Sequence, residues 1–571
     1  MIFLGISIGL GLLTYALTRR PLVAALTAAL TAIIAYITLP TLAWGYWSPI
    51  VLLGVALIIA VVVLANDLHE KGSNKTAKIT LGSLGIVIVI LVLVPFVTSA
   101  ALGRADRYHD LLSPVDTLQN TVDLPPFDPT QVRVVDQEMA VRLADKRLGE
   151  ITALGSQVNV GTMRIQSVAG DLFWVAPLDH RGFFKWLNNR EGTPGYVMVN
   201  ATNPSDVRLI TELGGAPLHL KYNGGSLFGD NIERHLYANG YTTRGMTDPT
   251  FEIDDEGRPF FTVTLYDNEI GFNGADATGV LTLDAQTGDV ADYRFEDAPA
   301  WIDRIHPEEM ILDQVGYWGK YPHGWWNPSD LDKLEPTSEA ALIYGKDGRS
   351  YFYTGLGSYG SDEGAIGYML VDTRTKDTRF FKQAGATEAA AMSAAESALP
   401  EKNFTASFPI PGNVNGEWTY ITPLKNAEGQ IGAIALVNVA DYRIVGVGEN
   451  ARIAERDYQR KLAARTGRIT TDAGVSRSEI QGIVTRAAAD IREGNTDYYL
   501  QISGSEGRVF IGGSSISPEL PITTVGDSVS LEFDETGSGI SFIKGFDNLS
   551  LSVGQGGPVP APTDSVTLPE Q

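Results

Sequence analysis

Four apolar segments at the N-terminus constrain this chain more than any other feature. None of them contains Asp, Glu, Lys or Arg, and each has about the length that a helix needs to cross ~30 Å of hydrocarbon. We therefore predict a transmembrane anchor of four helices over residues 1–102, in direct contact with the lipid bilayer. The segments are Met1–Leu17, Pro21–Leu39, Pro49–Ala65 and Leu81–Leu102.

The loops between these segments differ in charge. Arg19 and Arg20 lie in the first loop and three lysines lie in the third, whereas the second loop, residues 40–48, carries no positive charge. The positive-inside rule then places the first and third loops in the cytoplasm. An integral membrane protein with these four crossings would have its N-terminus and its large C-terminal region outside the cytoplasm. Arg104 and Arg107 argue for the reverse orientation.

Small residues recur at four-residue spacing in the first two segments. They are Gly5 and Gly9, followed by Ala24, Ala28 and Ala32. Such spacing lets helices approach closely, either within one bundle or between subunits. The absence of ionisable residues inside the segments counts against a transporter or pump.

The rest of the chain is acidic. The first 101 residues carry five basic and two acidic residues, a net of +3, whereas the whole chain has a net charge of −23. Without a basic cluster, this region is not suited to nucleic acid. The chain has no cysteine, which excludes disulfides, thiolate metal sites and cysteine nucleophiles.

One pattern of three strands returns four times between residues 172 and 445, and we expect helices at Asp136–Leu154, Thr387–Leu399 and Ala451–Leu462. The middle strand of each copy ends in a residue that we interpret as a turn former rather than a metal ligand: Asn200, Asp284, Asp372 or Asn438. Gly288 is expected at positive φ in one of these turns. The pattern predicts an α+β fold, with a connector over 103–135, a first pair of units over 136–298 and a second pair over 299–465.

The hairpin Asp284-Ala285-Gln286-Thr287-Gly288-Asp289-Val290 resembles the D-x-x-T-G-x-V turn of PepSY units, in which a helix packs on an antiparallel sheet. A longer region, about 139–462, resembles an uncharacterised family of bacterial multipass membrane-anchored envelope proteins. Segments such as Pro194–Val199, Pro299–Arg304 and Gly319–Asn327 carry this resemblance. It implies tandem PepSY-like repeats and an envelope location, and it transfers no functional residue.

The C-terminal part changes character. Short alternating strands over 479–550 predict a small β-barrel, OB-like or SH3-like. Because these strands lack basic residues interleaved with aromatics, we interpret the barrel as a docking module rather than an oligonucleotide-binding one. Residues 551–571, rich in Gly and Pro, are expected to form a disordered tail.

No motif for catalysis, cofactor binding or metal binding occurs in the sequence. HExxH, GxSxG and the P-loop are all missing. Ser358, Asp362 and Glu363 share a Gly-rich loop without an adjacent histidine base, and we interpret that loop as structural. We therefore predict no catalytic residue, no cofactor and no metal.

The densest aromatic stretch runs from residue 301 to 326. Its side chains would serve the core, a protein interface or a glycan-binding groove. The candidate interface residues are Trp301, Trp318, Tyr321, Trp325 and Trp326.

These features favour a non-enzymatic, membrane-anchored envelope scaffold or assembly protein that forms a homo-oligomer or binds an envelope protein partner. One alternative is a PepSY-type regulator that binds an envelope protease. The other is an enzyme of unrecognised class.

The loop charges predict that residues 102–571 are accessible from outside the cytoplasm. Protease added to intact spheroplasts should digest this region and spare the N-terminal segments, as followed by immunoblot. Full protection of residues 102–571 would reverse the predicted orientation.

Overall fold

The computed structural model describes residues 2–71, 74–112, 114–118, 132–151, 154–345, 348–360, 364–414, 416–466, 477–492, 495–505, 507–513, 516–534 and 540–551. The chain divides into two compact units, Met1–Ile469 and Thr470–Gln571, and each is described by itself. The expected tail, beyond its first residue, lies outside the described residues.

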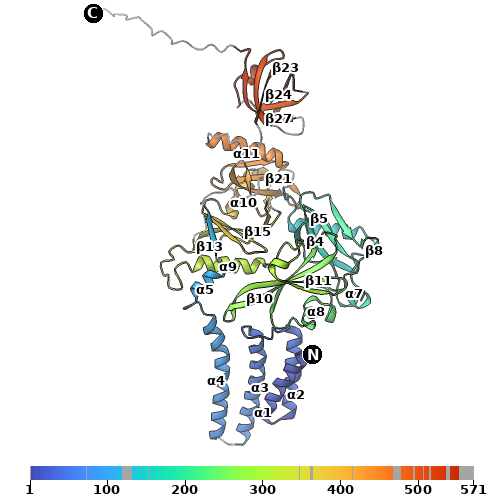
Figure 1. Cartoon of the computed structure of the whole chain (residues 1–571), viewed down its shortest axis with the longest axis vertical. Coiled ribbons are helices and arrows are strands. Elements are labelled where there is room, and N and C mark those ends of the chain that lie inside the picture. The colour runs from blue at the N-terminus through green and yellow to red at the C-terminus, as the bar shows by residue number, and fades with distance from the viewer. Residues whose placement is uncertain are drawn as a thin grey trace, which may run out of the picture. The chain divides into compact units, whose positions relative to one another are not determined.

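Apolar helices open the first unit (Figure 1). They are α1 Ile2–Thr18, α2 Pro21–Thr38, α3 Trp47–Lys71 and α4 Asn74–Ser99. Three stretches are long and apolar enough to cross a membrane, namely Pro21–Thr38, Trp47–Asp67 and Lys78–Ser99, whereas the apolar part of α1, Leu4–Thr18, is shorter. Large apolar side chains such as Leu22 and Phe96 are exposed on these helices. Extended exposed apolar surface of this kind fits a membrane anchor.

The small residues of α2 pack inside the helix bundle. A Cβ built on Gly11 would lie 2.9 Å from the Cβ of Ala28 and 3.0 Å from the carbonyl oxygen of Ala24, so α1 and α2 approach closely at this point. A Cβ built on Gly5 or Gly9 meets no atom within 4 Å. Ala24 and Ala28 of α2 therefore pack against α1 at Gly11, whereas the face of α1 that carries Gly5 and Gly9 is open.

Part of the expected connector has regular structure. It contains α5 Ala105–His109, η1 Asp110–Leu112 and β1 Val115–Leu118, and β1 pairs in parallel with β17 Thr378–Phe381. The Lys376 ammonium donates to the Leu111 carbonyl (2.9 Å) and to the Asp276 carboxylate (2.7 Å). Lys376, in the turn before β17, thereby joins the connector to the sheet that contains Asp276. The φ of Lys376 is +64°.

Four helices are each followed by an antiparallel meander of four strands, paired in chain order. The three strands expected in each copy are the last three of each meander. The units are α6 Gln137–Gly149 with β3 Arg164–Val168, β4 Asp171–His180, β5 Tyr196–Asn200 and β6 Val207–Ile210; α8 Ile232–Ala238 with β9 Gly245–Ile253, β10 Pro259–Ile270, β11 Asn273–Asp284 and β12 Val290–Tyr293; α9 Glu308–Lys320 with β14 Ala341–Tyr344, β15 Ser350–Ser358, β16 Ala365–Asp372 and β17; and α10 Glu388–Ser397 with β19 Ile410–Val414, β20 Glu417–Lys425, β21 Ile431–Asn438 and β22 Val445–Gly448.

Further elements complete this unit. They are β2 Val158–Val160, α7 Phe183–Asn188, β7 Glu212–Leu213, β8 Ala216–Pro217, η2 Phe228–Asp230, η3 Phe295–Asp297, β13 Leu334–Pro336, η4 Pro400–Lys402, β18 Thr405–Ala406 and α11 Ala451–Thr466. The expected helix starts at 136 and 387 are confirmed. Asp136 and Thr387 are the N-caps of α6 and α10, and each side chain accepts a hydrogen bond from a backbone N–H in the first turn.

The Asn or Asp at the end of each middle strand forms the turn that the sequence predicted. Each side-chain oxygen accepts one or two backbone N–H groups of the turn. The acceptor and donor residues are Asn200 with Thr202 and Asn203, Asp284 with Gln286 and Thr287, Asp372 with Arg374 and Thr375, and Asn438 with Asp441. These local contacts account for the Asn or Asp at each position as a turn former.

A second backbone contact repeats in all four units. The carbonyl of the buried residue after the Asn or Asp accepts an N–H from the segment that leads into the unit's helix. The pairs are Ala201 with Val134 and Val135, Ala285 with Tyr222, Thr373 with Ile305 and His306, and Val439 with Ala386. Each meander is thereby tied to its own helix by the same main-chain hydrogen bond.

The four sheets stack in the order second, first, third, fourth. Alternate side chains of the first sheet enter different cores: Phe173 and Val175 face the second sheet, whereas Trp174 and Ala176 face the third. The third sheet likewise packs Phe352 against the first sheet and Tyr353 against the fourth. Helix α11 covers the outer face of the fourth sheet through the fully buried Tyr458. The first and third sheets are therefore buried on both faces.

The second unit contains a closed barrel with the strand order β23-β24-β25-β27-β26. The strands are β23 Arg477–Arg492, β24 Asn495–Ile502, β25 Val509–Gly513, β26 Ser528–Asp534 and β27 Ile540–Asn548, with η5 Leu520–Ile522 between β25 and β26. β25 and β27 pair in parallel, and the other pairs are antiparallel. Its core includes Val484, Leu500, Phe510 and Leu531.

The Gly288→Val variant should destabilise the first unit by a few kcal/mol at most. Gly288 has a φ of +81°, and a Cβ there would lie 2.6 Å from the ring of Tyr222. The expected result is a lower melting temperature of the detergent-solubilised chain. Gly224→Val is the matched control, because a Cβ at this exposed position meets no atom within 4 Å. Equal melting temperatures for the two variants would contradict the turn assignment.

Candidate functional site

The five candidate interface residues occupy different environments. Trp301 is half-buried and stacks on Phe260, with ring centroids 5.0 Å apart. Trp318 lies on α9 between Phe380 (5.4 Å) and His109 (5.9 Å), and Tyr321 follows α9 with its ring 6.1 Å from that of Tyr108. These three side chains pack within the first unit.

Trp325 and Trp326 differ from the other three because they are exposed. Their side chains are 48% and 75% accessible, and their rings lie 5.6 Å from each other. Trp combines a large apolar area with one polar N–H group, which suits an exposed position at a protein interface. Within the aromatic stretch, this exposed pair is the part that a binding partner could contact.

The described residues contain no group of three or more His, Asp or Glu that could hold a metal ion. Ser358 ends β15, whereas Asp362 and Glu363 lie outside the described residues.

A buried acidic pair joins the first three sheets. Glu252 on β9 is 2% exposed, and burial, followed by the charge of Asp303, raises its pKa to about 8. Its carboxyl accepts the Thr262 hydroxyl (3.2 Å) and the Asp303 N–H (3.2 Å). Burial also raises the pKa of Asp303, whose carboxylate accepts the Ser167 N–H (2.7 Å) and the Tyr344 hydroxyl (2.8 Å).

This pair binds the polypeptide rather than a ligand. The segment around Asp303 is held further by Arg374, whose guanidinium donates to the carbonyls of Pro299 (2.8 Å) and Ala298 (2.9 Å). Perturbed carboxyl pKa values often mark catalytic sites. Here the hydrogen-bond partners all belong to strands and turns of the fold.

The hairpin of β10 and β11 carries the contact between the sheets and the apolar helices. Tyr46, in the loop between α2 and α3, is 7% exposed, and its hydroxyl accepts the Gly245 N–H at 2.9 Å. The same hydroxyl lies 2.7 Å from the Tyr266 carbonyl oxygen and 2.9 Å from the Asp267 carboxylate, to which it donates. Burial raises the pKa of Tyr46, so the hydroxyl stays protonated.

The tip of this hairpin fits against the end of α4. A Cβ at Gly271, which has a φ of +68°, would lie 2.6 Å from the Thr98 carbonyl oxygen, so this approach requires glycine. The next N–H, of Phe272, donates to the Ser99 hydroxyl at 2.9 Å. The Phe272 ring contacts Trp44 of the loop between α2 and α3 (5.2 Å) and Trp47 at the start of α3 (5.4 Å). The tip is thus clamped between two helix ends.

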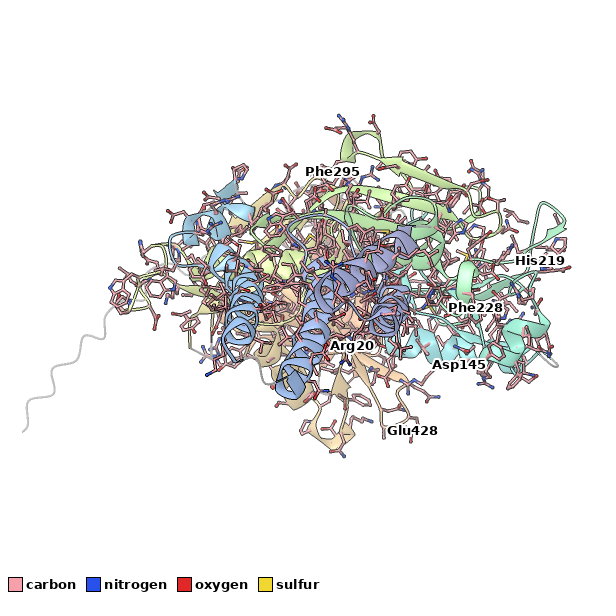
Figure 2. The ribbon with its side chains drawn as sticks, turned by 90° about the horizontal axis from the view of Figure 1, so that it is seen from below. Arg20, Asp145, His219, Phe228, Phe295 and Glu428 are labelled. Carbon is pink, nitrogen blue, oxygen red and sulfur yellow. The ribbon has the colours of Figure 1, made fainter. Side chains whose placement is uncertain are left out.

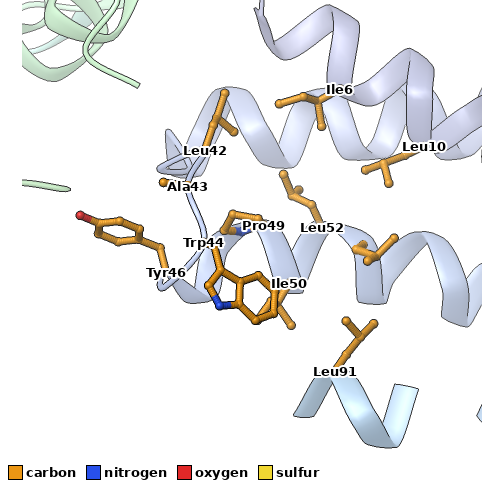
Figure 3. Close-up of a pocket in the computed structure, with 11 residues that line it drawn as sticks. Ile6, Leu10, Leu42, Ala43, Trp44, Tyr46, Pro49, Ile50, Leu52 and Leu91 are labelled. Atoms are coloured by element: carbon orange, nitrogen blue, oxygen red, sulfur yellow. The ribbon is translucent and has the colours of Figure 1, made fainter. Parts of the chain in front are cut away.

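An apolar cavity of about 300 Å³ lies beside this clamp, between α1, α3 and α4 (Figure 3). Its lining has no charged side chain. The lining includes Ile6, Leu10, Leu42, Trp44, Ile50 and Leu91. Such a cavity suits an alkyl chain, and it offers no convergent titratable groups for chemistry.

Sequence reasoning did not find the partner of the loop between α2 and α3, whose Tyr46 is buried against β10. The signal that could have found this contact is the short Ile270-Gly271-Phe272-Asn273 turn, because an apolar hairpin tip needs a covering surface.

Comparison with known proteins adds little. No protein-family model matches the chain, and no curated protein matches it. A solved structure of Trypanosoma rangeli sialidase in complex with the inhibitor DANA aligns with 68% of this chain and 55% of its own chain, at 8% identity and a TM-score of 0.15. The aligned part spans about half of that sialidase, and this likeness carries no argument about fold or activity.

The Tyr46→Phe variant should loosen the hairpin from the helices. It removes the acceptor of the buried Gly245 N–H, which costs about 1–3 kcal/mol. We expect a lower melting temperature in detergent and faster proteolysis near residues 266–273. Tyr442→Phe, at a half-exposed hydroxyl, should leave both measurements unchanged. A Tyr46→Phe variant as stable as wild type would show that the clamp does not depend on this hydroxyl.

Proposed function

We propose that this chain is a non-enzymatic, membrane-anchored envelope scaffold that self-associates. It would present tandem PepSY-like units outside the cytoplasm, carried by four transmembrane helices. The observation that carries the proposal is the clamp of the β10–β11 hairpin tip between the loop at Tyr46 and the end of α4. A protein that only tethers a mobile domain would not need this contact, whereas a scaffold must hold its units at a defined position relative to the membrane.

The stack of sheets supports a scaffold in a second way. Its cores run continuously from the second sheet to α11, and the buried carboxyl groups of Glu252 and Asp303 join three of its sheets through hydrogen bonds. Continuous double-sided burial resists shear between layers because well-packed interiors deform little. The helix-plus-meander order, with its Asx turns, supports assigning the units to the PepSY type.

The four-helix topology is also part of the proposal. α1 is short, but its ends match the expected loops, and Arg20 of the first loop forms an ion pair with Asp67 near the far end of α3. This contact brings the first loop and the positively charged third loop to the same end of the bundle, as the positive-inside rule requires. The opposite end carries the sheets.

Two open surfaces support self-association. The Gly5 and Gly9 face of α1 has no neighbour within 4 Å, and glycine faces of this spacing let transmembrane helices of different subunits approach. The exposed pair Trp325 and Trp326 has the residue type most enriched in the energetic centres of protein interfaces. In a membrane, such an assembly would take a symmetry axis along the membrane normal.

The barrel of the second unit is proposed to be an OB-type docking module. Its strand order, with a parallel pair between the third and fifth strands, supports the OB assignment.

Light scattering of the detergent-solubilised chain tests this function. We expect the protein mass to be a multiple of 61.6 kDa, and Trp326→Ala should reduce it toward that of one chain. Because Trp326 is exposed, this variant should keep its melting temperature. Tyr442→Ala, a comparably exposed aromatic elsewhere, is the matched control. A single-chain mass in several mild detergents would contradict self-association.

A further inference from the structure

An exposed apolar patch lies on α7 and η2, outside the aromatic stretch that the sequence singled out. Phe183, Phe184 and Leu187 of α7 are 45%, 74% and 45% accessible, and Phe228 of η2 is 53% accessible. The two elements touch through Trp186, which is buried and has its ring 5.5 Å from that of Phe228. We call these four exposed residues the phenylalanine patch.

The patch adjoins the end of the apolar helices that carries the sheets. η2 is separated from α8 by a single residue, and α8 contacts the end of α2 directly. The Tyr237 hydroxyl of α8 donates to the Pro40 carbonyl at 2.7 Å, and the Arg234 guanidinium lies 5.0 Å from the Tyr36 ring. Figure 1 shows α7 and α8 at the edge of the sheets nearest the helices, and in Figure 2, seen from below, Phe228 is labelled to the side of the helices.

The patch is held in place rather than exposed by chance. Phe228 has a φ of +52°, a backbone conformation that bulky residues rarely adopt, so the surrounding structure must enforce it. The Arg190 guanidinium lies 4.2 Å from the Trp186 ring centroid and 3.4 Å from the Asp230 carboxylate. These contacts join α7 to η2 behind the exposed rings.

The segment that carries α7 is basic, whereas the chain as a whole is acidic. Residues 181–190 contain Arg181, Lys185 and Arg190 and no acidic residue, in a protein whose net charge is −23. Basic side chains beside Phe, Trp and Leu on a short helix are typical of segments that lie in the headgroup zone of a membrane. A second copy of this acidic chain would match these basic residues too, but it would not explain why the patch lies on elements next to α8, which contacts the end of α2.

We propose that the phenylalanine patch inserts into the interfacial layer of the lipid leaflet next to the end of α2. The inference rests on the membrane anchor proposed above and not on self-association. In this arrangement the phenyl rings reach the acyl-chain boundary, and Arg181 and Lys185 lie level with headgroup phosphates. The first sheet would then touch the membrane surface through α7, in addition to its covalent link to the helices.

The absence of native cysteine allows a direct test on the full chain. Single variants Phe184→Cys and Phe228→Cys would be nitroxide-labelled and reconstituted in vesicles of equal parts phosphatidylcholine and phosphatidylglycerol. Electron paramagnetic resonance then compares the accessibility of each label to oxygen and to a water-soluble nickel chelate. Ile33→Cys, exposed on α2, is the lipid control, and Tyr442→Cys, on the turn after β21, is the aqueous control.

We expect the oxygen-to-nickel accessibility ratio at positions 184 and 228 to exceed that at 442 several-fold and to approach that at 33. A ratio at 184 and 228 equal to that at 442, with position 33 in lipid, would overturn the inference and leave the anchor intact. If the ratio at position 33 also equalled that at 442, the membrane anchor itself would be overturned. Spectral broadening that disappears on dilution with unlabelled chain would instead assign the patch to contact between copies, which also overturns the inference. If Phe228→Cys lowers the melting temperature, the ratio at position 184 alone tests the inference, because the Phe184 side chain is 74% exposed.

Discussion

Burial of both faces of the first and third sheets is the constraint on which the rest of this fold depends. An antiparallel sheet commonly keeps one face in solvent, and its strands then alternate between apolar and polar residues. Here successive residues such as Phe173 and Trp174, or Phe352 and Tyr353, enter different cores, so both must be large and apolar. Each fully buried side chain of this kind contributes about 1.5–3 kcal/mol. The layers cannot separate without exposing two such faces at once.

Polar groups inside this stack are used to join its layers. Tyr353 and Tyr420 of neighbouring sheets share a hydrogen bond at 2.8 Å, and Glu252 and Asp303 link three sheets through carboxyl groups that accept hydrogen bonds. A buried carboxyl without such partners would carry a desolvation cost of several kcal/mol. The same residues that would first attract a catalytic interpretation therefore have a structural explanation, which favours a scaffold.

The contact between the sheets and the apolar helices also depends on burying apolar side chains and hydrogen-bonding polar groups. The β10–β11 tip places Phe272 against Trp44 and Trp47, while Tyr46 satisfies the Gly245 N–H. With the phenylalanine patch on the neighbouring leaflet surface, the first and second sheets would each have a contact at the membrane. Two separate contacts limit tilting of the stack far more than one flexible linker would, because a linker of a few residues restricts distance but not orientation.

The sequence by itself determined the local features of this protein. The apolar helices, the caps at Asp136 and Thr387, the Asx turns and Gly288 at positive φ all depend on neighbours within a few residues, so they can be predicted from composition and spacing. Tertiary structure alone decided which faces meet. The non-sequential order of the sheets, the strand that precedes each predicted triplet, the separation of Trp301 from Trp325 and Trp326, and the pairing of Tyr46 with β10 depend on residues up to about two hundred positions apart. A continuous apolar run shows that a strand has two apolar faces. It does not say what covers each face, because many apolar surfaces satisfy the same hydrophobic requirement and only packing of the whole chain selects one.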